Sequence, residues 1–343
     1  MKIYNVALIG CGKIGAVHLE HIYFKENISV KCVCDTDLKK AELFKRKYGA
    51  EFAETEPLNC IDRPDVDIVI IATYPSTHTR LIELCFKHGK HVICEKPVAV
   101  NKEDEKKFYS LVRKYPNCKF LAGYILRHNE TYKKVAGMIR EGCIGRPIVM
   151  RMVQNHHTIN WERYLKLIKE TSPLIDCGVH YMDVMQWFTG EKIESVSAIG
   201  ARTEPDVPKD KYNYGLCTVK LSGGSIGYYE AGWTNSISAS DVKEFIGPKG
   251  RIKIIYKDNR TSNAEEGDLI EYYKYPEKEY ITINLNDERK PTDLQIEYLI
   301  NMIENDTPPV PSTDEICESL NAVFEADRQI REINLARIEL ATL

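Results

Sequence analysis

The stretch KIYNVALIGCGKIGAVHLEHI, residues 2–22, decides the fold of the first part of the chain. Its residues 3–9 are a short run of aliphatic and β-branched side chains, which predicts a strand, and a helical pattern of apolar residues follows. A G-x-G-x-x-G motif joins the two elements: its first glycine permits a tight turn, its second lets the backbone approach a pyrophosphate, and its third lets the helix pack closely on the strand. The helix N-terminus offers N–H groups and a partial positive charge to phosphates. The residues that we expect to contact a dinucleotide are Gly10, Gly12, Lys13, Ile14 and Gly15.

A second predicted strand, residues 28–35, ends in Asp35, about 20 residues beyond the last glycine. Dinucleotide-binding folds place an acidic residue there, where it hydrogen-bonds the hydroxyls of the adenosine ribose. Asp35 could instead cap the helix that begins near Leu38. A carboxylate at this position repels a 2′-phosphate, so the sequence favours NAD over NADP, although Lys39 and Lys40 lie close by.

Strands and helices alternate through the first 123 residues, which predicts an α/β Rossmann domain with a doubly wound parallel sheet over residues 1–123. The further strands are expected at 66–73, 90–95 and 118–124, and the further helices at 76–89 and 102–115. Ligands of such sheets bind beyond the carboxyl ends of the strands.

The stretch HVICEKPVAV, residues 91–100, ends a predicted buried strand with an acid, a base and a proline. Pro97 fixes the direction of the chain and keeps Lys96 out of helical geometry. Because this segment follows a strand at the same edge of the sheet as the glycine motif, Lys96 could reach a reacting oxygen at a nicotinamide. A solvent-exposed surface lysine is the alternative.

Residues 124–343 show a different pattern, which predicts an α+β domain with a large, mostly antiparallel open sheet covered on one face by helices. Helices are expected at 128–145, within 174–190 and at 311–334. Strands are expected at 146–157, 193–203, 212–221, 224–234, 241–247, 250–256, 268–275 and 279–285.

The composition is that of a soluble globular protein. The chain has 343 residues, of which 43% are hydrophobic and 28% charged. A formal net charge of -3 without a basic stripe argues against a nucleic-acid partner, and no apolar run approaches the ~18 residues that span a bilayer. The 11 cysteines include no Cys-x-x-Cys pair, so we expect reduced, buried thiols in a cytoplasmic protein, without disulfides or zinc. Examples are Cys32, Cys34, Cys85 and Cys94.

Four stretches occur in an order and at distances that resemble the Gfo/Idh/MocA oxidoreductases: GCGKIG, CEKPVAV, YKKVAGMIREGCIGRPI and DCGVHYMDVMQWFTG. The resemblance covers nearly the whole chain. It implies a Rossmann domain, a C-terminal open sheet, tightly bound NAD(P) and a sugar or polyol substrate. It also implies a homodimer or homotetramer in which the free faces of the C-terminal sheets pack together.

The resemblance also assigns catalytic residues. Lys96 matches the family's catalytic lysine, and Asp176 and His180 match its acidic and histidine partners. Residues four apart share a face if this segment is helical, but Gly178 makes a tight turn equally plausible. Two alternatives remain for the pair: a metal site completed by nearby residues, and a helix-capping Asp beside a hydrogen-bonded structural His. We expect no metal. The residues that could complete a metal site are His156, His157 and Asp183.

Other matches concern binding. Thr73 and His78 match a stretch that lies along the nicotinamide half of the cofactor, and Glu95 is expected to hold the loop or a cofactor hydroxyl. Arg127 falls where many members have an arginine, as a substrate contact or as plain helix surface. After a predicted strand, His157 and Trp161 would line a sugar pocket or belong to a surface loop with one anchoring Trp.

The expected function is an NAD-dependent dehydrogenase acting on a CH–OH group of a neutral sugar, polyol or inositol. His180 would accept the hydroxyl proton, Asp176 would orient the imidazole, and Lys96 would stabilise the developing negative charge. One alternative is a glycosidase that uses bound NAD in an internal redox cycle. Another is a cofactor-binding protein without catalysis, which has no need of these three residues.

Overall fold

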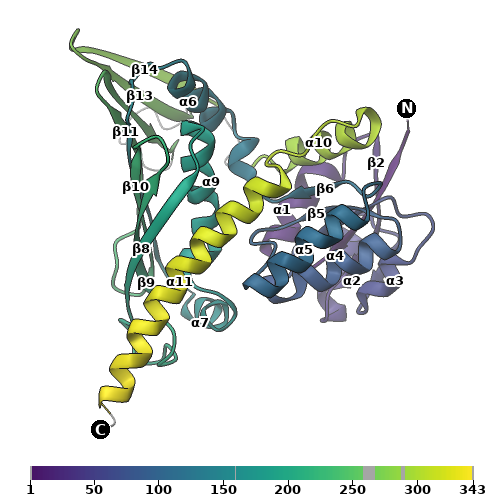
Figure 1. Cartoon of the computed structure of the whole chain (residues 1–343). Coiled ribbons are helices and arrows are strands. Elements are labelled where there is room, and N and C mark those ends of the chain that lie inside the picture. Colours follow the sequence, from purple (N-terminus) through teal and green to yellow (C-terminus); the bar gives the residue numbers. More distant parts are fainter. Residues whose placement is uncertain (1, 159, 258–266, 287–289, 342–343) are drawn as a thin grey trace. The chain divides into compact units, whose positions relative to one another are not determined.

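The computed structural model of the chain describes residues 2–158, 160–257, 267–286 and 290–341, with backbone only for His157 and for 334–341. These residues form two compact units, shown in Figure 1. The first unit contains residues up to His128 together with Lys290–Cys317, and the second contains Asn129–Arg289 and the chain from Glu318 onward.

The first unit is a six-stranded parallel sheet in the order β3-β2-β1-β4-β5-β6, which is the strand order of the dinucleotide-binding fold. Its strands are β1 (Tyr4–Ile9), β2 (Ile28–Cys34), β3 (Phe52–Glu54), β4 (Ile68–Ile71), β5 (His91–Cys94) and β6 (Phe120–Ala122). Its helices are α1 (Lys13–Ile22), α2 (Leu38–Tyr48), α3 (Pro57–Ile61), α4 (His78–Lys87), α5 (Lys102–Lys114) and α10 (Thr292–Asn305). Short 3-10 turns at Pro75–Thr77 and Ile125–Arg127 complete it. The predicted doubly wound parallel sheet is confirmed.

Helix α10 joins this unit from far along the chain. Its apolar face packs into the core formed by α1 and the central strands, with Ile296, Leu299 and Met302 almost completely buried. At the start of α10, Thr292 Oγ1 lies 2.8 Å from Nδ1 of His21 in α1. The first unit is therefore completed by a helix that the alternating pattern of the first 123 residues does not include.

The second unit is an eight-stranded sheet in the order β14-β13-β12-β11-β7-β10-β9-β8, in which only the β7–β10 pair is parallel. Its strands are β7 (Val149–His157), β8 (Ile193–Ala201), β9 (Tyr214–Leu221), β10 (Ile226–Thr234), β11 (Ser240–Gly247), β12 (Gly250–Ile255), β13 (Asp268–Lys274) and β14 (Glu279–Leu285). Its helices are α6 (Glu130–Arg140), α7 (Trp161–Glu170), α8 (Pro173–Asp176), α9 (Gly178–Thr189) and most of α11 (Thr313–Ala341). The predicted mostly antiparallel open sheet is confirmed.

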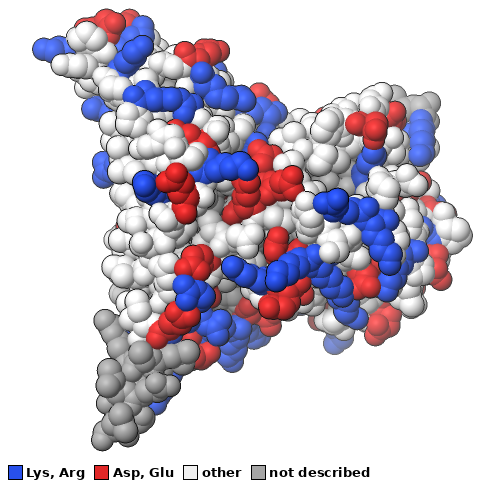
Figure 2. Space-filling view, viewed as in Figure 1, with Lys and Arg blue, Asp and Glu red and all other residues white. Residues whose placement is uncertain are grey.

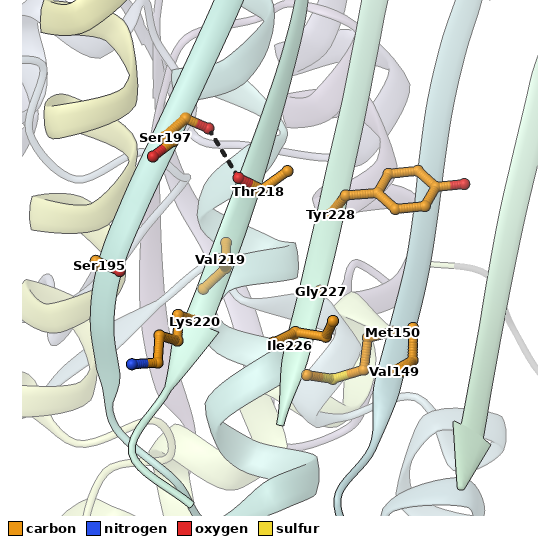
Figure 3. Close-up of a pocket in the computed structure, with 10 residues that line it drawn as sticks. All are labelled: Val149, Met150, Ser195, Ser197, Thr218, Val219, Lys220, Ile226, Gly227 and Tyr228. Atoms are coloured by element: carbon orange, nitrogen blue, oxygen red, sulfur yellow. Dashed lines mark hydrogen bonds between the residues drawn. The ribbon is translucent and has the colours of Figure 1, made fainter. Parts of the chain in front are cut away.

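The two faces of this sheet differ in burial. The inner face packs against helices such as α9, and Tyr229, Trp233 and Phe245 are almost completely buried there. On the outer face, Ile199 is 65% exposed and Ile226 is 49% exposed. A hollow of about 410 Å³ lies near Ile226 and is lined by residues of β7, β8, β9 and β10. Figure 3 shows these residues. This face is open in the single chain.

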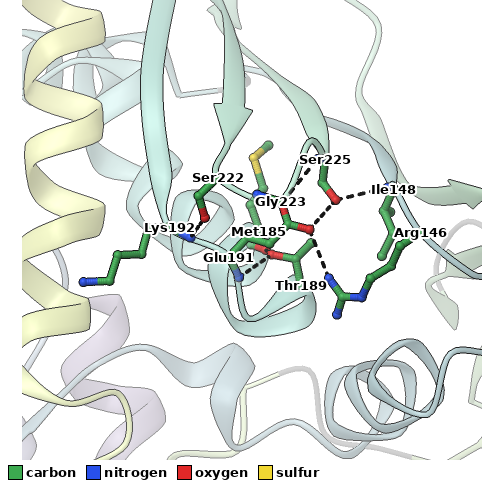
Figure 4. Close-up of polar contacts among 9 residues, drawn as sticks. All are labelled: Arg146, Ile148, Met185, Thr189, Glu191, Lys192, Ser222, Gly223 and Ser225. Carbon is green, nitrogen blue, oxygen red and sulfur yellow. Dashed lines mark hydrogen bonds and ion pairs between the residues drawn. The ribbon is translucent and has the colours of Figure 1, made fainter.

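A buried carboxylate ties the start of β8 to the β9–β10 turn (Figure 4). Glu191 accepts hydrogen bonds from the backbone N–H groups of Gly223 and Ser225 and from the Ser225 hydroxyl, at 2.9, 3.2 and 2.6 Å. Glu191 also forms an ion pair with the Arg146 guanidinium, at 3.0 Å. Because each acceptor position is filled by a donor, this side chain stabilises the turn despite its burial.

The cysteines include one departure from the sequence analysis. Cys32 in β2 and Cys60 in α3 form a disulfide across a Cα–Cα distance of 5.7 Å, so the expectation of reduced thiols is wrong for this pair. The packing of α3 on β2 brings together two positions 28 residues apart, which no local spacing indicates. Cys34, Cys85 and Cys94 are buried thiols as predicted, and burial raises the pKa of Cys34 to about 12. The cysteines therefore do not identify a cellular compartment.

Charges are mixed on the surface. Figure 2 shows Lys and Arg interspersed with Asp and Glu over the visible face of both units. Across the residues that the structure describes, no helix combines the length and the apolar character that crossing a bilayer requires.

Candidate active site

The glycine motif forms the turn between β1 and α1. Gly10 has a φ of +105°, and a Cβ there would lie 2.5 Å from the Ala72 carbonyl oxygen. A Cβ on Gly15 would lie 2.1 Å from the Gly10 carbonyl oxygen, so α1 approaches the loop this closely only with glycine. A Cβ on Gly12 would meet nothing within 4 Å, which leaves the middle of the loop open to a ligand.

Asp35 joins the end of β2 to this loop. One of its carboxylate oxygens accepts a hydrogen bond from the backbone N–H of Cys11, and the other accepts one from the N–H of Asp37, both at 3.0 Å. The helix cap is Asp37, whose side chain accepts from the N–H of Lys39 at 3.0 Å. The alternative role of Asp35 as the cap of α2 is therefore excluded. Each carboxylate oxygen keeps a further lone pair that a ribose hydroxyl could use.

A surface hollow lies beside Asp35, at the start of α2. Its lining residues are Thr36, Asp37, Leu38, Lys39, Glu42 and Arg46. Of the two lysines that the sequence placed near the adenosine ribose, only Lys39 lines this hollow. Both acidic and basic side chains line the hollow: Asp37, Lys39, Glu42 and Arg46.

Lys96 follows β5, and its neighbours in the chain are held by buried side chains of the first unit. Nε2 of His18 lies 2.8 Å from Oε1 of Glu95. Nδ1 of His78 lies 2.8 Å from the Pro97 carbonyl oxygen, and its Nε2 lies 3.1 Å from the Thr73 carbonyl oxygen. The structure thus brings together Thr73, His78 and the segment that carries Lys96. The part that the family resemblance implies for Thr73 and His78, along the nicotinamide half of the cofactor, stays a prediction.

His78 occupies an unexpected place in this group. Its side chain is completely buried, so it lies behind the loops and not on their surface. Burial lowers the pKa of His78, and the hydrogen bonds to the Pro97 and Thr73 carbonyls oppose this effect. Such a ring can hold the loops in place without contact to a ligand.

In the second unit, Asp176 and His180 lie on two helices and not on one. Helix α8 begins at the cap Ser172 and ends at Asp176, while α9 begins at Gly178, with Cys177 between them. The Cys177 thiol donates to Oδ2 of Asp176 at 3.3 Å, and His180 lies in the first turn of α9 with 9% of its surface exposed. Because the caps are Ser172 and Cys177, the alternative of Asp176 as a helix cap is excluded. Across the residues that the structure describes, no cluster of three His, Cys, Asp or Glu side chains could hold a metal ion.

The three candidate substrate contacts have different surroundings. The Arg127 guanidinium is 5% exposed and pairs with Oε1 of Glu315 at 2.9 Å. Trp161 begins α7, packs against a small apolar cluster that includes Trp233, and donates from Nε1 to Asp206 at 2.7 Å. The side chain of His157 lies outside the described residues. Anchoring of Trp161 is a role that the sequence left open, whereas the alternative of plain helix surface for Arg127 is wrong, because this side chain is buried.

His18 is the residue of this region that the sequence analysis missed. It lies in the apolar register of α1, between Ile14 and Ile22, and the sequence predicts only that this position is helical. A polar residue in an apolar register was the available signal. Its partner Glu95 is 77 positions away, which no local pattern could supply.

Each of the two parts of the chain matches a known protein family. Residues 4–124 match a family described as "Oxidoreductase family, NAD-binding Rossmann fold", and residues 132–253 match the Gfo/Idh/MocA C-terminal domain. The chain is 24% identical over 342 residues to the myo-inositol 2-dehydrogenase of Thermotoga maritima, covering 98% of each chain. It is 27% identical over 252 residues to the scyllo-inositol 2-dehydrogenase (NAD(+)) of Bacillus subtilis, covering 72% of each chain.

Solved structures share the fold. The myo-inositol 2-dehydrogenase from Lactobacillus plantarum matches with a TM-score of 0.81 at 20% identity, over 97% of this chain and 98% of that one. The scyllo-inositol dehydrogenase from Lactobacillus casei with bound NAD(H) and scyllo-inositol matches with a TM-score of 0.78 at 21% identity, over 97% and 98% of the two chains. At these identities the likeness concerns the fold.

Proposed function

Because the chain belongs to the Gfo/Idh/MocA oxidoreductase family, as its motifs predicted, we propose that it is an NAD-dependent dehydrogenase of an inositol or a related neutral polyol or sugar. The observation that carries the proposal is the carboxyl edge of the first unit's sheet. The glycine loop, Asp35 and Lys96 follow β1, β2 and β5 at that edge, where such sheets bind ligands. The names of two relatives, both inositol 2-dehydrogenases, support the substrate class.

Three features support a dinucleotide at this edge. A Cβ on Gly12 would meet nothing within 4 Å, the N-terminus of α1 offers N–H groups to a pyrophosphate, and Asp35 keeps lone pairs for ribose hydroxyls. The negative charge of Asp35 disfavours a 2′-phosphate, so we propose NAD as the cofactor.

NAD supplies the hydride acceptor, and residues of the chain handle the proton of the substrate hydroxyl. We assign proton transfer to His180, because imidazole is the side chain whose unperturbed pKa, about 6.5, lies near neutrality. Asp176 orients that ring and stabilises its charged form. To the Lys96 ammonium we assign the stabilisation of negative charge that develops on a substrate oxygen.

We propose that the active form is a homodimer or homotetramer built through the outer face of the eight-stranded sheet. Exposed apolar side chains such as Ile199 and Ile226 lie on that face. Light scattering on Ile226→Asp tests this: a smaller species than wild type is expected, and an unchanged mass would contradict the proposal. Phe24→Asp, at an exposed apolar residue of the first unit, is the matched control.

The function is tested by incubating the protein with free NAD and a panel of inositols, aldoses and glycosides. Accumulation of NADH in proportion to oxidised product is expected. Released sugar without NADH would support the internal redox cycle of a glycosidase, and tight NADH binding without turnover would support a non-catalytic protein.

Two substitutions test the catalytic assignments. His180→Ala should lower kcat by ~10²–10⁴ while NADH still binds, since removal of a proton-transfer group typically has this effect. Lys96→Met should lower kcat by at least ~10²–10³, since it removes a preorganised charge that stabilises the developing negative charge. The exposed Lys102, at the start of α5, provides the matched control Lys102→Met. A His180→Ala enzyme with near-native kcat would remove His180 as the base.

A further inference from the structure

Two completely buried histidines flank the segment that carries Lys96, and both belong to the first unit. His18 lies in the middle of α1 and contacts the residue before Lys96. His78 is the first residue of α4 and contacts the residue after it. Buried polar rings are uncommon unless they are hydrogen-bonded, so the partners of these two indicate what they do.

The proton of His18 can be placed from its surroundings. Nε2 lies 2.8 Å from Oε1 of Glu95, whereas Nδ1 is buried and has no hydrogen-bond partner among the described residues. A buried N–H without an acceptor costs about 1–3 kcal/mol, so the neutral ring carries its proton on Nε2. His18 therefore donates to a Glu95 carboxylate, which is a charge-assisted hydrogen bond.

Glu95 is confined from a second side by Gly123, just after β6. A Cβ on Gly123 would lie 3.0 Å from Cα of Glu95 and 3.1 Å from its Oε2. The Glu95 side chain thus occupies the space that any larger residue at 123 would need. Between the His18 ring and the Gly123 backbone, Glu95 has little freedom to move.

The segment after Lys96 is held by the start of α4. His78 contacts the Pro97 carbonyl oxygen at 2.8 Å, and the hydroxyl of Thr79 donates to the Val98 carbonyl oxygen at 3.4 Å. The other nitrogen of His78 lies 3.1 Å from the Thr73 carbonyl oxygen, at the end of the neighbouring strand β4. A neutral His78 ring has one N–H, which the shorter contact assigns to the Pro97 carbonyl, so the start of α4 holds the chain beyond Lys96.

We propose that His18 and His78 are positioning residues for Lys96, the first acting through Glu95 and the second through the Pro97 carbonyl. The inference rests on the catalytic role proposed for Lys96. A lysine side chain carries about 2 kcal/mol of rotamer entropy, so its ammonium is aimed only if the backbone on both sides is fixed. Misplacement of a catalytic group by about 1 Å can lower a rate about 10²-fold.

The first test compares two variants of His18. His18→Leu removes the donor and should lower kcat about 10–100-fold, with the dissociation constant of NADH within about threefold of wild type. His18→Gln can place an amide N–H near the former Nε2 and should recover at least about one third of wild-type kcat. His21→Leu, in the same helix, removes the contact with Thr292 and should leave kcat within about twofold. Equal losses in His18→Leu and His21→Leu would overturn the proposal.

A double-mutant cycle tests the route through Glu95. If His18 acts only through Glu95, then His18→Leu should have less than about a twofold effect on kcat once Glu95→Leu, which has no acceptor for the His18 N–H, is present. Multiplying losses would show that His18 acts elsewhere and would overturn this half of the proposal. His78→Gln should likewise lower kcat with little change in NADH binding, and near-native kcat in this variant would overturn the other half.

A measurement that needs no activity separates this proposal from the proposed function. Reductive methylation with carbon-13 labels lysine amines, and the Lys96 signal is identified in NMR spectra by its absence in Lys96→Arg. In folded His18→Leu and Gly123→Ala the signal should move towards that of exposed lysines. An unmoved signal would refute positioning, while a moved signal in a protein that oxidises no polyol would refute only the proposed function.

Discussion

Replacing Asp35 by serine should weaken the first unit as well as change its cofactor preference. The carboxylate accepts backbone hydrogen bonds from Cys11 in the glycine loop and from Asp37, each at 3.0 Å. A serine hydroxyl is shorter and has one oxygen, so at most the local bond to Asp37 survives. The N–H of Cys11 then loses its acceptor at the point where the loop meets β2.

The magnitude follows from the exposure of the two bonds. A hydrogen bond to a charged group contributes about 1.5–3 kcal/mol, and the partly buried bond to Cys11 is lost in full. The bond to Asp37 is exposed, so water replaces it at a cost of about 1 kcal/mol or less. Asp35→Ser should therefore lower the free energy of unfolding by about 1.5–4 kcal/mol.

Urea unfolding of the cofactor-free protein measures this change. The control is Asp37→Ser, because serine caps a helix about as well as aspartate, and a change below about 0.5 kcal/mol is expected there. A stability of Asp35→Ser equal to that of wild type would refute the hydrogen-bond argument.

The effect on the cofactor is measured separately, as the ratio of dissociation constants for NADH and NADPH. Asp35→Ser, alone or with Thr36→Arg, should shift this ratio towards NADPH, because a negative charge next to the 2′-phosphate is removed. If the wild-type protein already prefers NADPH, the assignment of Asp35 to the ribose is wrong.

Three further outcomes are expected. Gly15→Ala should lower both NADH affinity and stability, the latter by about 1–3 kcal/mol in urea unfolding, because its Cβ would meet the Gly10 carbonyl oxygen at 2.1 Å; unchanged affinity would contradict this. Burial lowers the pKa of His78, so as the pH falls below 6.5 the unfolded chain takes up a proton at this residue that the folded chain does not. The free energy of unfolding should therefore decrease as the pH falls through this range, and it should decrease less steeply in His78→Gln. Glu191→Gln should destabilise the second unit by about 2–4 kcal/mol in thermal or urea unfolding, since an amide cannot accept all the hydrogen bonds that the carboxylate accepts; a neutral effect would count against the geometry in Figure 4.

Much of the first unit could be predicted because its signals are local. The glycine motif, Asp35 and Lys96 each follow a predicted strand, and the parallel-sheet rule places all of them at one edge. The return of α10 to this unit could not be predicted in the same way, because docking of its apolar face on α1 depends on packing between distant segments. The Cys32–Cys60 disulfide was missed for the same reason.

The segment around Asp176 and His180 shows a limit of a different kind. The sequence left two alternatives for this pair, one shared helix face and a tight turn at Gly178, and the structure divides the segment into α8 and α9, with Cys177 between them. The signals for the start of α8, Ser172 followed by Pro173, are present in the sequence.

Residues that contact a ligand can be recognised in a sequence by different features from the residues that position those contacts. A candidate ligand contact that follows a strand or opens a helix is revealed by its place relative to local elements, as with Lys96 after β5, for which we propose this role. A candidate positioning residue acts across the fold, and its partner can lie 77 positions away, as with His18 and Glu95. Its only local trace is a polar side chain where the helix register calls for an apolar one. Since burial of such a ring is unfavourable unless a partner uses its hydrogen bond, this mismatch directs attention to the buried face of α1, and from there to Lys96.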